Sequence, residues 1–263
     1  MSNFQRNELY WGKEFQKSLS QKTVAIIGLG GVGGFALEAL ARVGIENFTI
    51  LDFDTISSTN INRQLIATVE NIGKLKTQEW KVRLKLINPK INLKIYNTFL
   101  EKSQLEEIFT PKPDFIIDAI DTIKSKLELI WYAKENNIPI ITSMGAGNRI
   151  DASKLKTVDI SEIKTNCNFA KNLIKNLNKM GIEKDLPVVF SDEKPKNLEK
   201  VKTIEKINTT EGEIEITKFS PASISTVPAV AGYLMANYVI LQFFNNYSWY
   251  FFRAKIIQEE ELC

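Results

Sequence analysis

The sequence predicts an α/β fold: a Rossmann-like, doubly wound and mostly parallel sheet, with a C-terminal α/β extension. Three observations carry this prediction. Apolar, β-branched runs alternate with helical patterns up to about residue 145. The first run, residues 23–27, is apolar at successive positions, as strands buried on both faces are. A glycine-rich loop, residues 28–34, lies between this strand and the next helix.

The first βαβ unit is the clearest part of the pattern. After the glycine loop, residues 35–43 have helical spacing and good helix formers, and Gly44 is a suitable residue to follow the helix end. A second strand is expected at residues 48–51, directly before Asp52. The unit has about the thirty residues expected of a nucleotide-binding βαβ motif.

The remaining elements of the core follow the same alternation. A polar loop over 54–64 precedes a helix that ends near residue 86, before Asn88 and Pro89. Then come a strand at 91–96, a short helix at 103–108, a strand at 115–118, a helix at 124–136 and a strand at 139–142. Residues 1–150 are therefore expected to form a nucleotide-binding core with an N-terminal helical arm.

Residues 151–263 are expected to be the C-terminal part of the same domain. The patterns indicate a strand at 155–160, a helix at 168–179, a strand at 187–190, a mobile polar loop at 192–212 and an apolar helix at 222–244. The last segment is long enough to span a membrane. Its Pro228, Gly232 and Asn237 favour a buried helix or a dimer-interface helix, and membrane contact stays open as the alternative.

Composition narrows the function classes. Histidine is absent, so no imidazole can serve as a base or a metal ligand. Two cysteines, Cys167 and Cys263, are too few for a disulfide framework or a tetracysteine zinc site. The N-terminus is polar and lacks the apolar region of a signal peptide, so we expect a cytoplasmic protein, with membrane association left open. Residues 154–206 are rich in lysine, which suits either a solvated surface or a nucleic-acid contact.

The glycine loop indicates a nucleotide. Its G-x-G-x-x-G spacing permits a tight turn and lets backbone N–H groups approach a phosphate at a helix N-terminus. Asp52, at the end of the next strand, is placed to bind a ribose hydroxyl, so NAD and ATP fit this loop equally well.

Charged residues further along the chain favour ATP and adenylation of a carboxylate. Arg63 offers a planar fork to phosphate oxygens and Lys76 a point charge, as transfer at an α-phosphorus requires. Asp121, just past a strand, is placed to hold magnesium on the triphosphate. The candidate nucleotide-binding residues are Gly28, Gly30, Gly31, Gly33, Asp52, Asp54, Asn60, Arg63, Gln64, Lys76 and Asp121.

These residues resemble the signature of the ubiquitin-activating-enzyme-like adenylation superfamily, which includes the activators of molybdopterin and thiamine sulfur carriers. Arg6 lies where, in that superfamily, an arginine reaches the ATP site of the neighbouring subunit. The resemblance thus implies a homodimer with Arg6 as a fourth catalytic residue beside Arg63, Lys76 and Asp121. Over nearly the whole chain the sequence is most similar to the tRNA threonylcarbamoyladenosine dehydratases, through residues 118–122, 138–147, Asp151, the helix at 164–177 and 188–191.

That resemblance implies an ATP-dependent cyclisation of threonylcarbamoyladenosine in tRNA through an acyl-adenylate, with AMP and pyrophosphate released. The missing zinc cysteines fit this branch. The segment 219–223 lacks a cysteine that some dehydratases carry, which puts a sulfur-accepting role in doubt, and we read Cys167 as a buried structural residue. A bound monovalent cation and a sulfur-transfer partner protein are left open.

Three other functions are kept as alternatives: an activator of a sulfur-carrier or ubiquitin-like protein, a nicotinamide-dependent oxidoreductase, and a non-catalytic tRNA-binding or membrane-associated scaffold. For tRNA itself, Arg149 and Lys154 are expected to begin a phosphate-binding track that continues through the lysine-rich second half.

Overall fold

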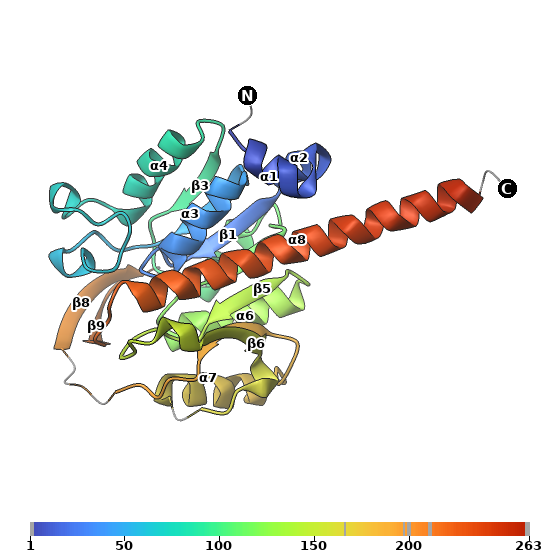
Figure 1. Ribbon diagram of the computed structural model, residues 1–263. Coiled ribbons are helices and arrows are strands. Elements are labelled where there is room, and N and C mark those ends of the chain that lie inside the picture. The colour runs from blue at the N-terminus through green and yellow to red at the C-terminus, as the bar shows by residue number, and fades with distance from the viewer. Residues whose placement is uncertain (1–2, 166, 197, 199–200, 210–211, 261–263) are drawn as a thin grey trace.

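A seven-stranded sheet runs through the molecule in the order β3-β2-β1-β4-β5-β7-β6 (Figure 1). In this computed structural model the described residues are 3–165, 167–196, 198, 201–209 and 212–260. The strands are β1 (Thr23–Ile27), β2 (Asn47–Leu51), β3 (Asn92–Tyr96), β4 (Phe115–Asp118), β5 (Ile140–Ser143), β6 (Leu155–Asp159) and β7 (Pro187–Ser191). All neighbours are parallel except β6 and β7, so the predicted mostly parallel, doubly wound sheet is confirmed.

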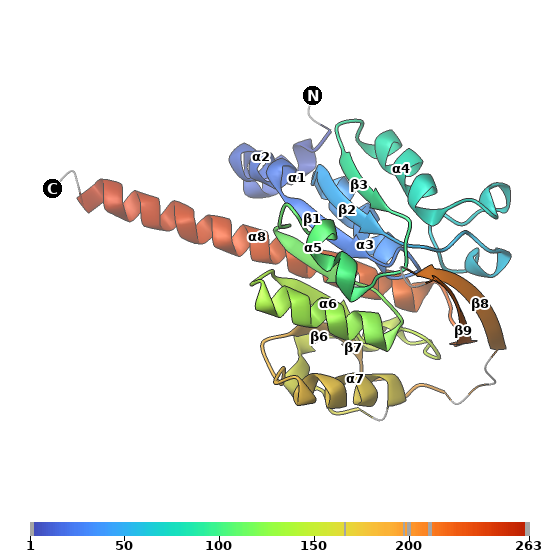
Figure 2. The same cartoon turned by 180° about the vertical axis from the view of Figure 1, so that it is seen from behind.

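Helices cover both faces of this sheet, as Figure 2 shows from behind. They are α1 (Gln5–Trp11), α2 (Lys13–Gln21), α3 (Gly33–Val43), α4 (Lys76–Ile87), α5 (Leu105–Ile108), α6 (Ile123–Glu135), α7 (Asn168–Lys179) and α8 (Thr226–Glu260). One buried cluster joins the sheet to α2, α3, α4 and α8, and a second joins it to α5, α6 and α7. Along β1, Val24 and Ile26 belong to the first cluster, and Ala25 and Ile27 to the second. This alternation explains why the strand reads as apolar throughout.

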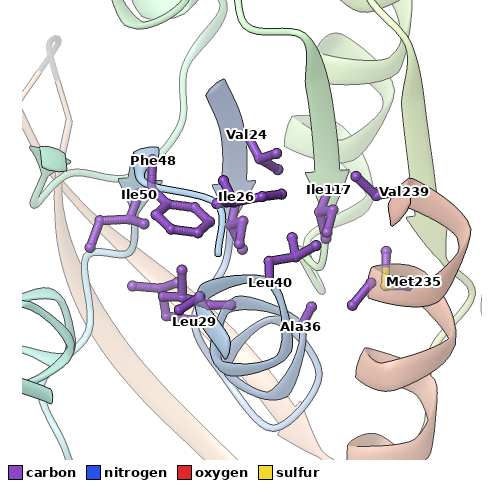
Figure 3. Close-up of a cluster of buried hydrophobic side chains, with 14 of the residues drawn as sticks. Val24, Ile26, Leu29, Ala36, Leu40, Phe48, Ile50, Ile117, Met235 and Val239 are labelled. Atoms are coloured by element: carbon purple, nitrogen blue, oxygen red, sulfur yellow. The ribbon is translucent and has the colours of Figure 1, made fainter. Parts of the chain in front are cut away.

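The start of α8 is a core element. Figure 3 shows Met235 and Val239 beside Ala36 and Leu40 of α3. Gly232 permits this close packing, because an added Cβ would come within 2.3 Å of the backbone oxygen of Val32. The predicted helix at 222–244 therefore exists, but it begins at Thr226 and continues to Glu260, beyond the body of the protein (Figure 1).

The prediction of a mobile loop at 192–212 is wrong for residues 201–209. They form β8 (Val201–Thr209), which pairs antiparallel with β9 (Gly212–Ser220) in a separate two-stranded ribbon. The β-branched residues Val201, Thr203, Ile204, Ile207 and Thr209 favour a strand, but the lysines and glutamate between them break a strict period-two pattern and make the segment resemble a polar loop. Residues 197, 199–200 and 210–211 of the predicted loop lie outside the described part of the chain.

Candidate nucleotide-binding and adenylation site

The predicted nucleotide-binding residues gather at the carboxyl edge of the sheet. The loop that starts at Gly28 follows β1, Asp52 follows β2, and Asp118 ends β4. β1 lies between β2 and β4, so the chain order reverses at this strand. Ligands of doubly wound sheets bind in the crevice at such a switch point. The sheet topology therefore places the glycine loop where a nucleotide is expected.

The glycine loop is packed so tightly that side chains are excluded from it. Gly28 has φ +90, and an added Cβ would lie 2.8 Å from the backbone oxygen of Ala119. At Gly33, the first residue of α3, an added Cβ would lie 1.8 Å from the backbone oxygen of Gly28. The strand-to-helix turn consequently needs glycine at both positions, and the first backbone N–H groups of a helix that starts here are suited to bind a phosphate.

Asp52 holds this loop from the neighbouring strand. Its Oδ2 accepts a hydrogen bond from the backbone N–H of Leu29 (2.7 Å), and its Oδ1 accepts one from Asp54 (2.9 Å). Burial raises the pKa of Asp52, although attraction to Lys76 and the two backbone bonds oppose the rise. The carboxylate predicted to meet a ribose thus also fixes the shape of the glycine-loop turn.

Lys76 lies at the start of α4, and its side chain approaches the carboxylates of Asp52 and Asp54. Residues 54–56 pair with residues 74–76 through backbone hydrogen bonds, which bring the two segments together. The Lys76 Nζ lies 2.6 Å from Asp54 Oδ2 and 3.7 Å from Asp52 Oδ1. Because the Lys76 side chain is only 5% exposed, water screens the interactions of its ammonium group only weakly.

Residues 60–64 form a tight turn next to the glycine loop. The Asn60 side chain accepts from the backbone N–H of Ser57, so this predicted ligand also closes the turn that carries Arg63. Arg63 Nη1 donates to the backbone oxygen of Thr59 (2.6 Å) and to Asn62 Oδ1 (2.9 Å). Burial lowers the pKa of Arg63, but a guanidinium stays charged at neutral pH.

Gln64 places a buried acceptor without a hydrogen-bond partner beside the glycine loop. Its side chain is 7% exposed, and a Cβ added to Gly30 would lie 3.8 Å from its Nε2. Its Oε1 is buried without a hydrogen-bond partner, a state that among the described residues only Trp80 Nε1 shares. A buried acceptor normally has a donor. The amide beside the glycine loop therefore fits a group that arrives with the nucleotide.

Sequence reasoning missed a buried ion pair beneath Asp121. Lys126 of α6 donates to Asp118 Oδ2 and to Thr142 Oγ1, both at 2.7 Å, and neither Lys126 nor Asp118 is exposed. Burial lowers the pKa of Lys126, opposed by attraction to Asp118 and Asp121. Asp121 itself is exposed. Its carboxylate is thus available at the edge, beside a fixed buried cation.

Arg149 does not belong to a phosphate-binding track. It is 6% exposed, and its guanidinium donates to the backbone oxygens of Gly145, Gly147 and Glu193. These bonds hold together the loop after β5, so the predicted role for Arg149 is wrong. Lys154 is exposed, as that role requires.

Arg6 lies away from the glycine loop of its own chain. It is an exposed residue of α1, and α1 and α2 pack at the C-terminal end of α3, where Asn7 and Gln16 donate to the backbone oxygen of Val43. The glycine loop is at the other end of α3, and 11 residues of helix span about 16 Å. The structure therefore does not bring Arg6 together with Arg63 within one chain.

Two surface hollows lie outside the crevice. One of about 400 Å³ is lined by Lys164, Thr165, Phe190 and residues 192–195, and one of about 580 Å³ lies between α6 and the end of α7. Neither contains a predicted nucleotide-binding residue. Within the described ranges, no three histidine, cysteine or acidic side chains cluster as metal ligands would. Cys167 is buried before α7, as expected for a structural residue.

The fold and this edge define a nucleotide-binding α/β protein of the kind that adenylates carboxylates. The chain belongs to the ThiF family, whose model matches residues 4–255. It is 38% identical to tRNA threonylcarbamoyladenosine dehydratase of Bacillus subtilis, over 92% of this chain and 94% of that protein. It is also 34% identical to molybdopterin-synthase adenylyltransferase of Haemophilus influenzae, over 52% of this chain and 55% of that one.

Among solved structures, the chain is similar to Escherichia coli tRNA N6-threonylcarbamoyladenosine dehydratase, TcdA, in complex with ATP. The TM-score is 0.80 at 25% identity, over 94% of this chain and 95% of that one. The TcdA complex with AMP gives a TM-score of 0.79 at 26% identity. The predicted fold class and family are confirmed by these similarities.

Proposed function

We propose that the protein is an ATP-dependent dehydratase that cyclises threonylcarbamoyladenosine in tRNA. The observation that carries the proposal is the glycine loop flanked by Arg63, Lys76 and the unpaired, buried Oε1 of Gln64. The similarity to the Bacillus subtilis dehydratase over almost the full length of both chains supports the choice of substrate.

The chemistry at this edge is the activation of a carboxylate. A carboxylate oxygen of the modified nucleoside attacks the α-phosphorus of ATP, and pyrophosphate leaves. Arg63 and Lys76 are the cations that stabilise the charge spreading over the phosphoryl oxygens. An internal nucleophile of the substrate then attacks the activated carbonyl carbon and expels AMP. The carboxylate oxygen departs with AMP, so the nucleoside loses one water in total.

Asp121 is the proposed magnesium ligand. Its exposed carboxylate stands at the edge beside Lys126, whose charge is already balanced by Asp118. A hard divalent cation prefers one or two carboxylates together with phosphate oxygens. When bound, magnesium would supply charge neutralisation on the triphosphate.

The direct test compares Arg63→Ala and Asp121→Ala with the wild type in an assay for AMP release from ATP and threonylcarbamoylated tRNA. Loss of one group that stabilises the transition state lowers kcat by about 10²–10³-fold. Arg42→Ala and Asp114→Ala are matched controls, since Arg42 lies near the end of α3 and Asp114 precedes β4 at the opposite edge of the sheet. Equal activity of the site variants and the wild type would contradict the assignment.

We also propose a homodimer in which Arg6 completes the site of the partner. The support is its exposed position, about one helix length from the site of its own chain. An equimolar mixture of Arg6→Ala and Arg63→Ala chains is expected to recover activity, because a mixed dimer contains one intact site. Continued inactivity of a mixture that has been shown to exchange subunits would contradict this arrangement.

For tRNA, we propose that the exposed lysines of α7 contact phosphates. Lys171, Lys175 and Lys179 recur every four residues on one helical face, and Lys164 and Lys184 flank the helix. Replacing the three helical lysines by glutamine should weaken tRNA binding and flatten its dependence on salt. An unchanged salt slope would refute their role.

We infer that the apolar run in α8 is a core helix rather than a membrane span. Residues 226–247 are apolar enough to cross a membrane, with a mean hydropathy of 1.4. One face of this run, including Val227, Ala231, Met235 and Val239, is however buried against the rest of the protein. Sedimentation of the protein with lipid vesicles would overturn this inference.

The alternative is an activator of a sulfur-carrier protein, favoured by the similarity to molybdopterin-synthase adenylyltransferase. Both functions use the same ATP site, so variants of Arg63 cannot separate them. Exchange between ATP and pyrophosphate that depends on a partner protein ending in Gly-Gly would favour the alternative. Exchange that depends on modified tRNA favours the dehydratase.

A further inference from the structure

The two-stranded ribbon is attached to the nucleotide site through a short segment, Pro221 to Ser223, which we call the root. The root directly follows the end of β9 at Ser220, and two residues separate it from the start of α8 at Thr226. Figures 1 and 2 both show the ribbon projecting beside the N-terminal end of α8. Within α8, Pro228 lies against the glycine loop, since a Cβ added to Gly31 would be 3.2 Å from the Pro228 Cβ. The root is therefore next to the nucleotide-binding edge.

On one side, the root is bonded to Asn148 in the loop after β5. The backbone N–H of Asn148 donates to the oxygen of Ala222 (2.7 Å), and the Ala222 N–H donates to Asn148 Oδ1 (2.8 Å). The oxygen of Asn148 accepts from the N–H of Lys196, on the chain leading to the ribbon (3.0 Å). Asn148 thus holds the chain on both sides of the ribbon.

On the other side, the root is bonded to Asn62. The Asn62 Nδ2 donates to the backbone oxygen of Ser223 (2.9 Å), and its Oδ1 accepts from Arg63 Nη1 (2.9 Å). The two partners fix the orientation of this amide, because a guanidinium only donates and a carbonyl oxygen only accepts. Asn62 is exposed, so neither burial nor core packing accounts for its position.

We propose that Asn62 is a positioning residue that couples the root of the ribbon to Arg63. The proposal rests on the proposed function in one respect, namely that Arg63 binds the phosphates of ATP. Phosphates that engage Arg63 restrain Asn62, which in turn restrains the Ser223 carbonyl and the root. Because coupling between two sites is reciprocal, a substrate that orders the ribbon also restrains Arg63 in the position that binds the nucleotide.

The variant Asn62→Asp tests the hydrogen bond to Ser223 separately from the hydrogen bond to Arg63. The aspartate keeps an acceptor for Arg63 but loses the donor to Ser223, and it places a negative charge beside that carbonyl oxygen. Asn62→Ala removes both bonds. Asn176→Asp is the matched control, since Asn176 of α7 also donates through its side-chain amide to a backbone oxygen, that of Asn172.

The experiment is hydrogen–deuterium exchange of the full-length protein, with and without a non-hydrolysable ATP analogue, read on peptides that contain Ala222 and Ser223. In the wild type and in Asn176→Asp, the analogue is expected to slow exchange of the root at least about fivefold, the lower end of typical coupling. In Asn62→Asp the effect should fall below about twofold while the affinity for the analogue, measured by calorimetry, stays within about threefold. Asn62→Ala should lose both the protection and part of the affinity.

Full protection of the root in Asn62→Asp would overturn the proposal, as would a wild type that binds the analogue without any change at the root. Neither result depends on tRNA. Failure of the proposed function is separately visible, as an absence of analogue binding in calorimetry or of AMP release with modified tRNA. A variant that fails to fold is recognised by its circular dichroism, and Asn62→Ser then replaces Asn62→Asp as the variant with an altered donor.

Discussion

Replacing Lys126 by methionine should be one of the most destabilising single changes at the carboxyl edge. The Lys126 Nζ is 2.7 Å from Asp118 Oδ2, and both side chains are fully buried. Removing the cation leaves the Asp118 carboxyl group in the interior, where among the described residues the Thr142 hydroxyl and the N–H of Ile120 remain as its hydrogen-bond partners. Loss of one partner of a buried pair costs about 3–5 kcal/mol. Since the free energy of unfolding of a domain is about 5–15 kcal/mol, this loss would be a large fraction of it.

The assay is urea unfolding followed by circular dichroism, with the free energy of unfolding extrapolated to water. Lys22→Met is the control, because Lys22 pairs with Asp114 at a similar distance of 2.8 Å but with side chains 37% and 35% exposed. It should cost less than about 1 kcal/mol. The double variant Lys126→Met with Asp118→Asn removes both charges and should regain at least half of the loss. A loss below about 1 kcal/mol in Lys126→Met, or no recovery in the double variant, would refute the reasoning.

Three further outcomes follow from the same geometry. Gly33→Ala should weaken binding of an ATP analogue at least about tenfold in calorimetry and lower the free energy of unfolding by about 1–3 kcal/mol, since its Cβ meets the Gly28 oxygen; unchanged binding would contradict the glycine-loop assignment. Burial alone would raise the pKa of Glu38, but bonds from Arg83 and Arg42 outweigh it and hold that pKa below its usual value. The stability that Glu38 contributes is therefore present above about pH 4.5 and lost as the pH falls through the folded-state pKa. The free energy of unfolding of Glu38→Gln should consequently depend less on pH in acid than that of the wild type. Parallel pH profiles of the two proteins would contradict this. Trp80→Phe removes packed volume from a fully buried site but no hydrogen bond, so it should cost about 1–3 kcal/mol; a loss above about 4 kcal/mol would show that the indole N–H has a partner.

The sequence was sufficient for the parts of the fold that local patterns encode. The strand at 23–27, the glycine loop and the helix after it are contiguous, and each carries its own signal. The glycine loop, Asp52 and Asp121 could be expected to lie close together, because each comes after a strand of the parallel sheet and the carboxyl ends of these strands meet at one edge.

What could not be predicted depends on contacts between distant segments. In the sequence Lys126 is indistinguishable from an exposed helical lysine, and its buried position depends on β5, which brings Thr142 beside Asp118. Arg149 reads as a surface cation, and only the folded loop shows its bonds to three backbone oxygens. The link from Asn62 to Ser223 spans 161 residues, and no spacing rule reveals it.

The measurement that tests the central claim most directly uses wild-type protein, ATP, magnesium and tRNA carrying threonylcarbamoyladenosine. AMP release is quantified, and the modified nucleoside is isolated and its mass is measured by mass spectrometry. The adenylation account predicts one AMP for each nucleoside converted, and a product lighter by one water. No AMP above the enzyme-free background, or a nucleoside of unchanged mass, would contradict it.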